Sequence, residues 1–140
     1  MTTESNAIDK LRSHCSSVEV TTFRDQTRVV VPRHELADAL ALLHGSLEFD
    51  LLIDITCVDY LGYRGATDRF GLVYLLSNST TNERITLRVM LNEPDLSVVS
   101  AVSLWEGADW LEREVWDMFG IQFDGHPDLR RILLPEEFSA

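Results

Sequence analysis

Three β-strand patterns follow one another between residues 48 and 91, and they constrain the fold most strongly. Residues 70–77 are apolar on both faces, as in a central strand, and residues 84–91 alternate between apolar and polar. Successive strands without helices between them indicate an α+β fold rather than a doubly wound sheet. Residues 48–60 also alternate, which predicts one buried face formed by Phe49, Leu51, Ile53, Ile55 and Cys57.

The flanking segments add a hairpin and several helices. β-Branched residues at 18–23 and 27–31 predict two more strands. Leu36, Leu40 and Leu43 have helical spacing, and Gly45 is placed to end that helix. We therefore predict one domain, with helices packed on a mixed sheet of about five strands in the order α-β-β-α-β-β-β-α-α-tail. The remaining helices are expected at residues 6–13, 97–105 and 109–119, the last ended by Gly120, within a domain of residues 1–140.

The charge of the chain restricts its partners. Its 140 residues carry a formal net charge of -11, which disfavours binding to nucleic acid and direct docking on an anionic membrane. No apolar stretch approaches the roughly 18 residues that span a bilayer, and the N-terminus lacks a signal pattern. We expect a soluble protein, or one that contacts a membrane only through a partner. Arginine dominates over lysine, which suits pairing with carboxylates at interfaces, although ordinary solubility of an acidic protein explains the charge equally well.

Few residues of the chain are candidates for catalysis or for binding a metal or cofactor. Cys15 and Cys57 form no CxxC motif, the four histidines lack metal-ligand spacing, and no phosphate-binding glycine motif occurs. We therefore expect no catalytic, cofactor-binding or metal residues in this chain. A small acid–base enzyme using Asp54, Asp59 or His126 is a weaker alternative, because the two aspartates fit a solvent-facing strand and turn.

Residues 110–135 have an unusual composition. Arg113 and Asp117 are spaced to pair on a helix, but such a pair adds only about 0.2–0.5 kcal/mol, too little to explain the cluster of charges. All three tryptophans, Trp105, Trp110 and Trp116, lie in or just before this segment. Large aromatics beside arginines and acids are typical of an interface core, but a tryptophan-rich core helix with a solvated charged face fits as well.

The same segment carries a run of residues that reads as one signature: Glu112-Arg113-Glu114, Asp117, Met118-Phe119-Gly120, Phe123, Gly125-His126-Pro127 and Leu129-Arg130-Arg131-Ile132-Leu133. This signature resembles that of the 30-kDa (C) subunit family of respiratory complex I, the NADH:quinone oxidoreductase. The resemblance covers roughly residues 48–138, including the three strand patterns, and extends more loosely to the N-terminal part.

The resemblance implies a non-catalytic structural subunit of the hydrophilic arm of a proton-translocating enzyme of the respiratory chain. Such a subunit docks on the 49-kDa-type (D) subunit near the quinone-reducing end, on the cytoplasmic face of the bacterial inner membrane. It holds no cofactor itself, and FMN and iron–sulfur clusters are expected in partner subunits. The same resemblance leaves open a related membrane-bound hydrogenase, a ferredoxin-fed complex, or a free-standing assembly or adaptor module.

We predict that the partner-binding surface combines the helix near residue 113 with an extended tail, residues 121–140. Its arginines would act as charge anchors, because an arginine buried against a partner carboxylate is costly to remove. The predicted partner-binding residues are Glu112, Arg113, Glu114, Trp116, Asp117, His126, Asp128, Arg130 and Arg131.

Overall fold

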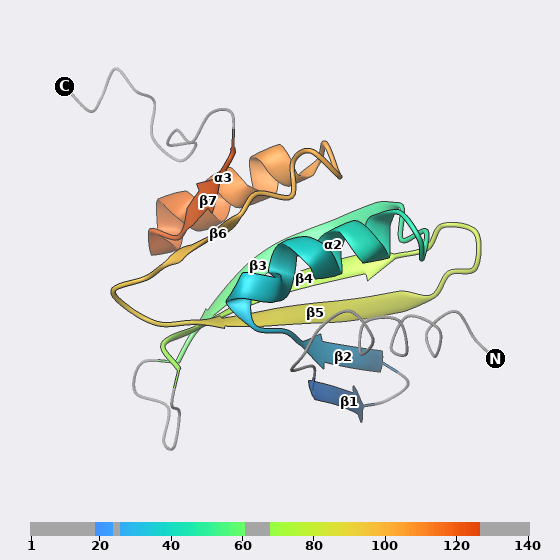
Figure 1. Ribbon diagram of the computed structural model, residues 1–140, viewed down its shortest axis with the longest axis horizontal. Coiled ribbons are helices and arrows are strands. Elements are labelled where there is room, and N and C mark those ends of the chain that lie inside the picture. The colour runs from blue at the N-terminus through green and yellow to red at the C-terminus, as the bar shows by residue number, and fades with distance from the viewer. Residues whose placement is uncertain (1–18, 24–25, 61–67, 127–140) are drawn as a thin grey trace.

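The computed structural model describes residues 19–23, 26–60 and 68–126 (Figure 1). The helix predicted at residues 6–13 and the part of the tail beyond residue 126 lie outside the described residues. The elements are β1 (Glu19–Phe23), β2 (Gln26–Val30), the short 3-10 helix η1 (Arg33–Glu35), α2 (Leu36–His44), β3 (Leu51–Asp59), β4 (Phe70–Ser77), β5 (Arg84–Leu91), β6 (Ser97–Val99), α3 (Ala108–Phe119) and β7 (Gln122–Asp124).

Five strands form a mixed sheet in the order β1-β2-β5-β4-β3. The β2–β5 pair is parallel, and the other three neighbouring pairs are antiparallel. β6 and β7 form a separate parallel pair beside α3 (Figure 1). The α+β class and the mixed sheet of five strands with packed helices confirm the fold expected from the sequence.

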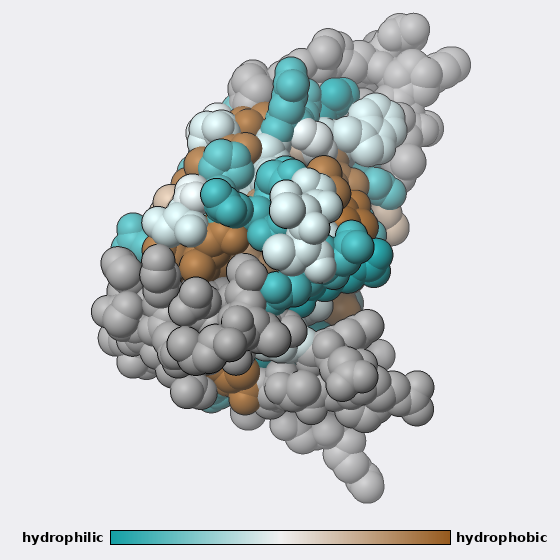
Figure 2. Space-filling view, turned by 90° about the vertical axis from the view of Figure 1, so that its right-hand side faces the viewer, coloured by the Kyte–Doolittle hydropathy of each residue, from teal (hydrophilic) through white to brown (hydrophobic). Residues whose placement is uncertain are grey.

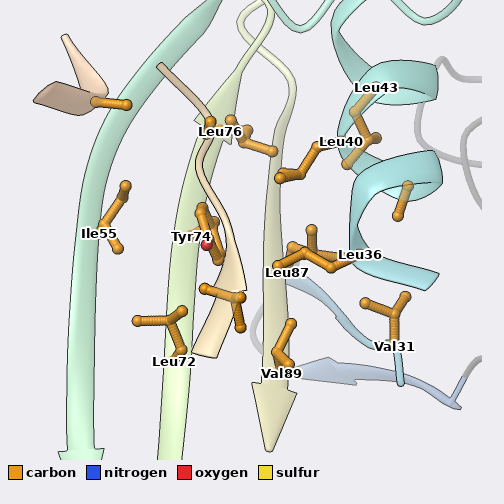
Figure 3. Close-up of a cluster of buried hydrophobic side chains, with 14 of the residues drawn as sticks. Val31, Leu36, Leu40, Leu43, Ile55, Leu72, Tyr74, Leu76, Leu87 and Val89 are labelled. Atoms are coloured by element: carbon orange, nitrogen blue, oxygen red, sulfur yellow. The ribbon is translucent and has the colours of Figure 1, made fainter. Parts of the chain in front are cut away.

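The main core lies between the sheet and α2. Leucines at helical spacing on α2 point toward the central strands (Figure 3). Each of these leucines is at most 1% exposed, so α2 is held chiefly by apolar burial rather than by its own helix propensity. One buried cluster contains Leu36, Leu40 and Leu43 of α2 together with Leu72, Tyr74, Leu76, Leu87 and Val89 of β4 and β5 (Figure 3).

The segment that contains α3 packs on the same side of the sheet. The Phe119 ring meets the Phe70 ring edge-on, with centroids 6.1 Å apart. The indole N–H of Trp105 donates to the carbonyl of Phe49 at 3.0 Å, and His44 at the end of α2 lies edge-on to the same indole. Both helices therefore cover one face of the sheet, and the other face is left without a helix of the described chain.

One strand differs from its predicted alternation. The β3–β4 register shifts between Leu52 and Asp54, which is the mark of a β-bulge at Ile53. Because of this shift, Leu51 and Ile53 point outward and are 48% and 42% exposed. Ile55, after the bulge, points into the core and is 3% exposed. The prediction that Leu51 and Ile53 face the core is wrong. Burial of Phe49 and Ile55 is confirmed.

The helix predicted at residues 97–105 is also wrong. Its first residues form the strand β6, and turns lead from there to α3. Val98 and Val99 favour an extended backbone, and pairing with β7 satisfies their backbone hydrogen bonds. The pairing partner lies more than 20 positions downstream, so local periodicity in residues 97–105 does not predict it.

Hydrophobic residues also reach the surface of this small domain. Figure 2 views the right-hand side of Figure 1 and shows brown, hydrophobic residues between teal, hydrophilic ones. A domain of this size always leaves part of its apolar surface in contact with solvent. Single exposed apolar residues therefore carry little information, and a candidate site needs apolar residues together with polar groups that lack partners.

Candidate partner-binding surface on α3

The helix α3 has a buried inner side and an exposed outer side. Ala108, Glu112 and Val115 are buried on the inner side, at most 4% exposed. Trp110 and Met118 on the outer side are 56% and 58% exposed. Their spacing of eight residues brings them to the same side of the helix, about two turns apart. Among the described residues of this segment, Trp110 and Met118 are the exposed large hydrophobic side chains.

Gly120 ends the helix as predicted. It adopts φ 75°, in the left-handed region that glycine enters without steric cost, and its N–H donates to the carbonyl of Trp116 at 2.9 Å. The chain then reverses into β7, which pairs with β6. This reversal returns the segment after α3 along the helix toward its first turn.

Glu112 is a fully buried acid at 0% exposure. One of its oxygens accepts from the Ser100 hydroxyl and the other from the Ala101 N–H, each at 2.6 Å. Desolvation raises the pKa of Glu112, and these two hydrogen bonds and the nearby His126 act in the opposite direction. The carboxylate thus joins α3 to the segment that follows β6, with both of its oxygens occupied.

His126 closes the same network. Its side chain is 0% exposed, and Nε2 lies 3.1 Å from the Asp109 carbonyl oxygen and 3.0 Å from Asp109 Oδ1. Nε2 is also 4.0 Å from Glu112 Oε1. A proton on Nε2 lets the ring donate to the first turn of α3. The contact fixes the point from which the tail continues beyond residue 126.

Arg113 lies on the outer side with an incomplete set of contacts. Its guanidinium carbon is 5.6 Å from the centroid of the Trp110 ring, within the range of a cation–π contact. Its Nε is buried and has no hydrogen-bond partner within the described part of the chain. A buried donor without an acceptor costs free energy, so Arg113 is poised to gain from an added carboxylate or carbonyl.

The structure divides the nine predicted residues into three groups. Glu112 and His126 have buried side chains, and Arg113, Glu114, Trp116 and Asp117 are each partly exposed on α3. Asp128, Arg130 and Arg131 lie outside the described residues. The assignment of these nine residues to partner binding stays a prediction.

Sequence reasoning misses the two most exposed apolar residues of the helix as partner-binding candidates. In the sequence, Trp110 is one of three clustered tryptophans, and Met118 has helical spacing to the apolar residues Leu111 and Val115. Because Glu112 lies on the buried side of α3, Trp110 and Met118, which are roughly opposite it on a helical wheel, face outward. That signal is present in the sequence, but the usual assumption that glutamate faces solvent conceals it.

The other predicted candidates for chemistry have ordinary polar contacts. Asp59 accepts from Arg69 Nε at 2.9 Å, and Asp54 accepts from the N–H of Ile55 at 2.9 Å. Burial, with help from Asp59, raises the pKa of the Cys57 thiol to about 12, which makes this thiol a poor nucleophile. Among residues 19–23, 26–60 and 68–126, no group of three or more His, Cys, Asp or Glu side chains is arranged for a metal. None of the helices there has the length and apolar character to cross a membrane.

Comparison with known proteins decides the family. Residues 29–140 match the model of a family described as respiratory-chain NADH dehydrogenase, 30 Kd subunit. The chain belongs to this family. The match covers the sheet from β2 onward, α3 and the tail, so the family resemblance seen in the sequence signature is confirmed.

Individual relatives of the 30 Kd subunit family agree. The C subunit of the NADH-quinone oxidoreductase of Trichlorobacter lovleyi is 40% identical over 142 residues, covering 100% of this chain and 86% of the relative. The equivalent protein of Geobacter sulfurreducens is 37% identical over 140 residues, covering 99% of this chain and 85% of the relative. Alignment over nearly the whole chain includes the residues beyond 126.

Solved structures show the same fold. A trypsin-resistant fragment of Nqo5 superposes with a TM-score of 0.83 at 31% identity, covering 91% of this chain and 100% of the fragment. A chain of an archaeal membrane-bound sulfane sulfur reductase superposes with a TM-score of 0.78 at 20% identity, covering 95% of this chain and 77% of that one. The second likeness shows the fold alone.

Proposed function

We propose that this chain is a non-catalytic structural subunit of the hydrophilic arm of a proton-translocating NADH:quinone oxidoreductase. It docks on the 49-kDa-type subunit near the quinone-reducing end, through the outer side of α3 and the tail. FMN and iron–sulfur clusters belong to other subunits. The complex holds the chain at the cytoplasmic face of the bacterial inner membrane. The names of the relatives support the assignment to an NADH:quinone oxidoreductase, and the geometry of α3 supports its use as a docking surface.

The observation that carries the docking proposal is the state of Arg113. Its Nε has no acceptor among the described residues, and an acceptor supplied by a partner would offset the free energy cost of burying that donor. Trp110 beside it is 56% exposed and presents a flat ring to the same partner. Tryptophan and arginine together are the residue types that most often dominate binding energy at protein interfaces.

Glu112 and His126 are buried beneath this surface and hold it in position. Their side chains are buried and bonded within the chain, so they contribute by holding α3 and the start of the tail in a fixed relation. A preorganised surface loses less conformational entropy when it binds. The partner then contacts the arginines and the exposed aromatic, and the acid–histidine network sets their positions.

A complex with another electron donor is a second candidate. The likeness to a chain of an archaeal respiratory membrane complex shows that the fold also occurs in a complex named as a sulfane sulfur reductase. Purification of the complex that contains this chain distinguishes the two. Co-purification of an FMN-binding subunit with NADH-oxidising activity supports the first, and its absence from an otherwise intact complex supports the second.

The test of docking is a pair of measurements on Arg113→Ala and Arg130→Ala. We expect each variant to lose about 2–5 kcal/mol of binding to the 49-kDa-type subunit, roughly thirty-fold or more in affinity. Thermal unfolding of the isolated chain should change little for either variant, because the proposal assigns the acceptors of both arginines to the partner.

The matched control is Arg33→Ala. Arg33 is a surface arginine on η1 that pairs with Asp95 within the chain, so its loss should leave partner binding unchanged. Normal binding of the Arg113 and Arg130 variants, together with a collapsed melting temperature, contradicts the docking proposal. The cluster would then be an internal brace.

A further inference from the structure

The face of the sheet opposite α2 has an unusual set of residues. Strand register places Asp54, Leu75, Thr86 and Arg28 in one row across β3, β4, β5 and β2. The next row contains Thr56, Val73 and Arg88. These side chains alternate with the core residues of the same strands, so they point away from both helices.

This face is hollowed. A depression of about 340 Å³ is lined by Val73 and Leu75 on β4, by Arg84, Thr86 and Arg88 on β5, and by Arg28 on β2. Val73 and Leu75 are half-buried at its floor. A sheet face that meets only water normally carries polar residues at alternate positions. The apolar strip on β4 departs from that pattern and indicates a face that is covered.

Two of the arginines on this face, Arg84 and Arg88, lack side-chain partners among the described residues. Neither Arg84 nor Arg88 makes an ion pair or side-chain hydrogen bond within the described part of the chain. By contrast, Arg33 and Arg69 each pair with a carboxylate. The chain has a net charge of -11 and therefore many acids that might have paired with these arginines. A basic rim beside an apolar strip in an acidic protein is complementary to an acidic, amphipathic segment.

We propose that this sheet face is a second docking surface, and that its occupant is an acidic amphipathic helix of another subunit of the same complex. A helix is about 10–12 Å wide, and neighbouring strands are about 4.8 Å apart, so a helix along β4 also covers β3 and β5. Its apolar side lies over Val73 and Leu75. Its carboxylates face Arg84 and Arg88, and Asp54 on the opposite flank disfavours the reversed arrangement.

This surface is independent of α3. The helix α3 contacts Phe70 on the core side of β4, whereas Val73 and Leu75 point to the other side. Both surfaces are therefore accessible to different subunits at the same time. The inference rests on the proposed function only in requiring a multi-subunit complex, and it survives if α3 proves to have no partner.

The first test compares two variants of equal charge change. Arg84→Gln/Arg88→Gln and Ala37→Glu/Ala41→Glu each make the chain more negative by two, and the alanines are exposed on α2, on the other side of the sheet. We expect the arginine variant to bind the rest of the complex about tenfold or more weakly, and to dissociate at lower salt. The alanine variant should bind as the wild type does. Equal behaviour of both variants overturns the proposal.

The second test identifies the occupant. A photo-cross-linking residue at Thr86, introduced into the full chain within the purified complex, should capture a peptide of another subunit rich in aspartate and glutamate. The same residue at Ala41 should not capture that peptide. A cross-link within this chain, a cross-link to a second copy, capture of a peptide without acids, or no cross-link overturns the proposal. So does an arginine variant whose melting temperature falls in the isolated chain, because the chain then covers this face itself.

Discussion

The inner and outer sides of α3 contain the same kinds of residue and use them in opposite ways. Glu112 and Glu114 are two positions apart, yet the first is fully buried with both oxygens bonded, and the second is partly exposed. On the outer side, Arg113 has a buried nitrogen without an acceptor among the described residues. Satisfied polar groups within a chain contribute to folding, whereas unsatisfied ones at its surface are available for binding. A single sequence motif therefore contains residues bonded within the chain and residues that we propose bind a partner.

The strand β3 shows the same contrast and gives the largest expected effect. Ile55→Ala should cost about 2–5 kcal/mol of unfolding free energy, because Ile55 is enclosed in the core. Ile53→Ala should cost less than about 1 kcal/mol, because the bulge exposes 42% of that residue. Urea unfolding of both variants measures the difference. Equal costs would mean that the bulge is absent in solution.

Removal of the buried acid comes next. Glu112→Ala leaves the Ser100 hydroxyl and the Ala101 N–H without their acceptor and should cost roughly 2–4 kcal/mol. Glu114→Ala should stay within about 0.5 kcal/mol, as at most surface positions. Thermal unfolding of the two isolated variants compares the sides of α3 directly. A larger loss for Glu114→Ala would reverse the assignment of inner and outer sides.

The pH dependence of stability sharpens the same point. Burial raises the pKa of Glu112 above 4.5, so the folded chain binds this proton more tightly than the unfolded chain does. The contribution of Glu112 to the free energy of unfolding is therefore fully present below about pH 4.5, and it is lost as pH rises through the folded-state pKa. The free energy of unfolding is measured against pH for the wild type and for Glu112→Gln. The difference between the two curves should isolate this decline. A difference that grows with pH would show a lowered pKa instead.

Tyr74→Phe should have the smallest effect. The Tyr74 hydroxyl is buried and has no hydrogen-bond partner among the described residues, although the ring packs fully in the core. Replacing it with phenylalanine keeps the ring and removes an unsatisfied group, so stability should be unchanged or rise by up to about 1 kcal/mol. A loss of more than about 1 kcal/mol in chemical unfolding would reveal a polar partner for the hydroxyl.

Local pattern in the sequence predicts those parts of the fold that depend on neighbouring residues. Strands β4 and β5, the leucine face of α2 and the glycine end of α3 all follow from periodicity and end signals that lie within a few residues of each other. The features that local pattern misses depend on distant residues. β6 is a strand because it pairs with β7, and the bulge at Ile53 is set by register with β4.

The candidate site divides in the same manner. The cluster of charged and aromatic residues around Arg113 is visible in the sequence, and so is the family signature. The burial of Glu112 is not visible, because it depends on Ser100 and Ala101, which reach α3 only through the turn after β6. Composition thus indicates that the segment is a candidate site, and tertiary contacts decide which of its side chains are buried and which stay exposed.

Oxidative footprinting of Trp110 and Met118 tests the central claim most directly. Both side chains are more than half exposed in the isolated chain, and both residue types react readily with hydroxyl radicals. The account predicts rapid oxidation in the isolated chain and strong protection of both residues in its purified complex with the 49-kDa-type subunit. Equal oxidation in the two samples, with the complex shown to be intact, would contradict the claim that the outer side of α3 is the docking surface.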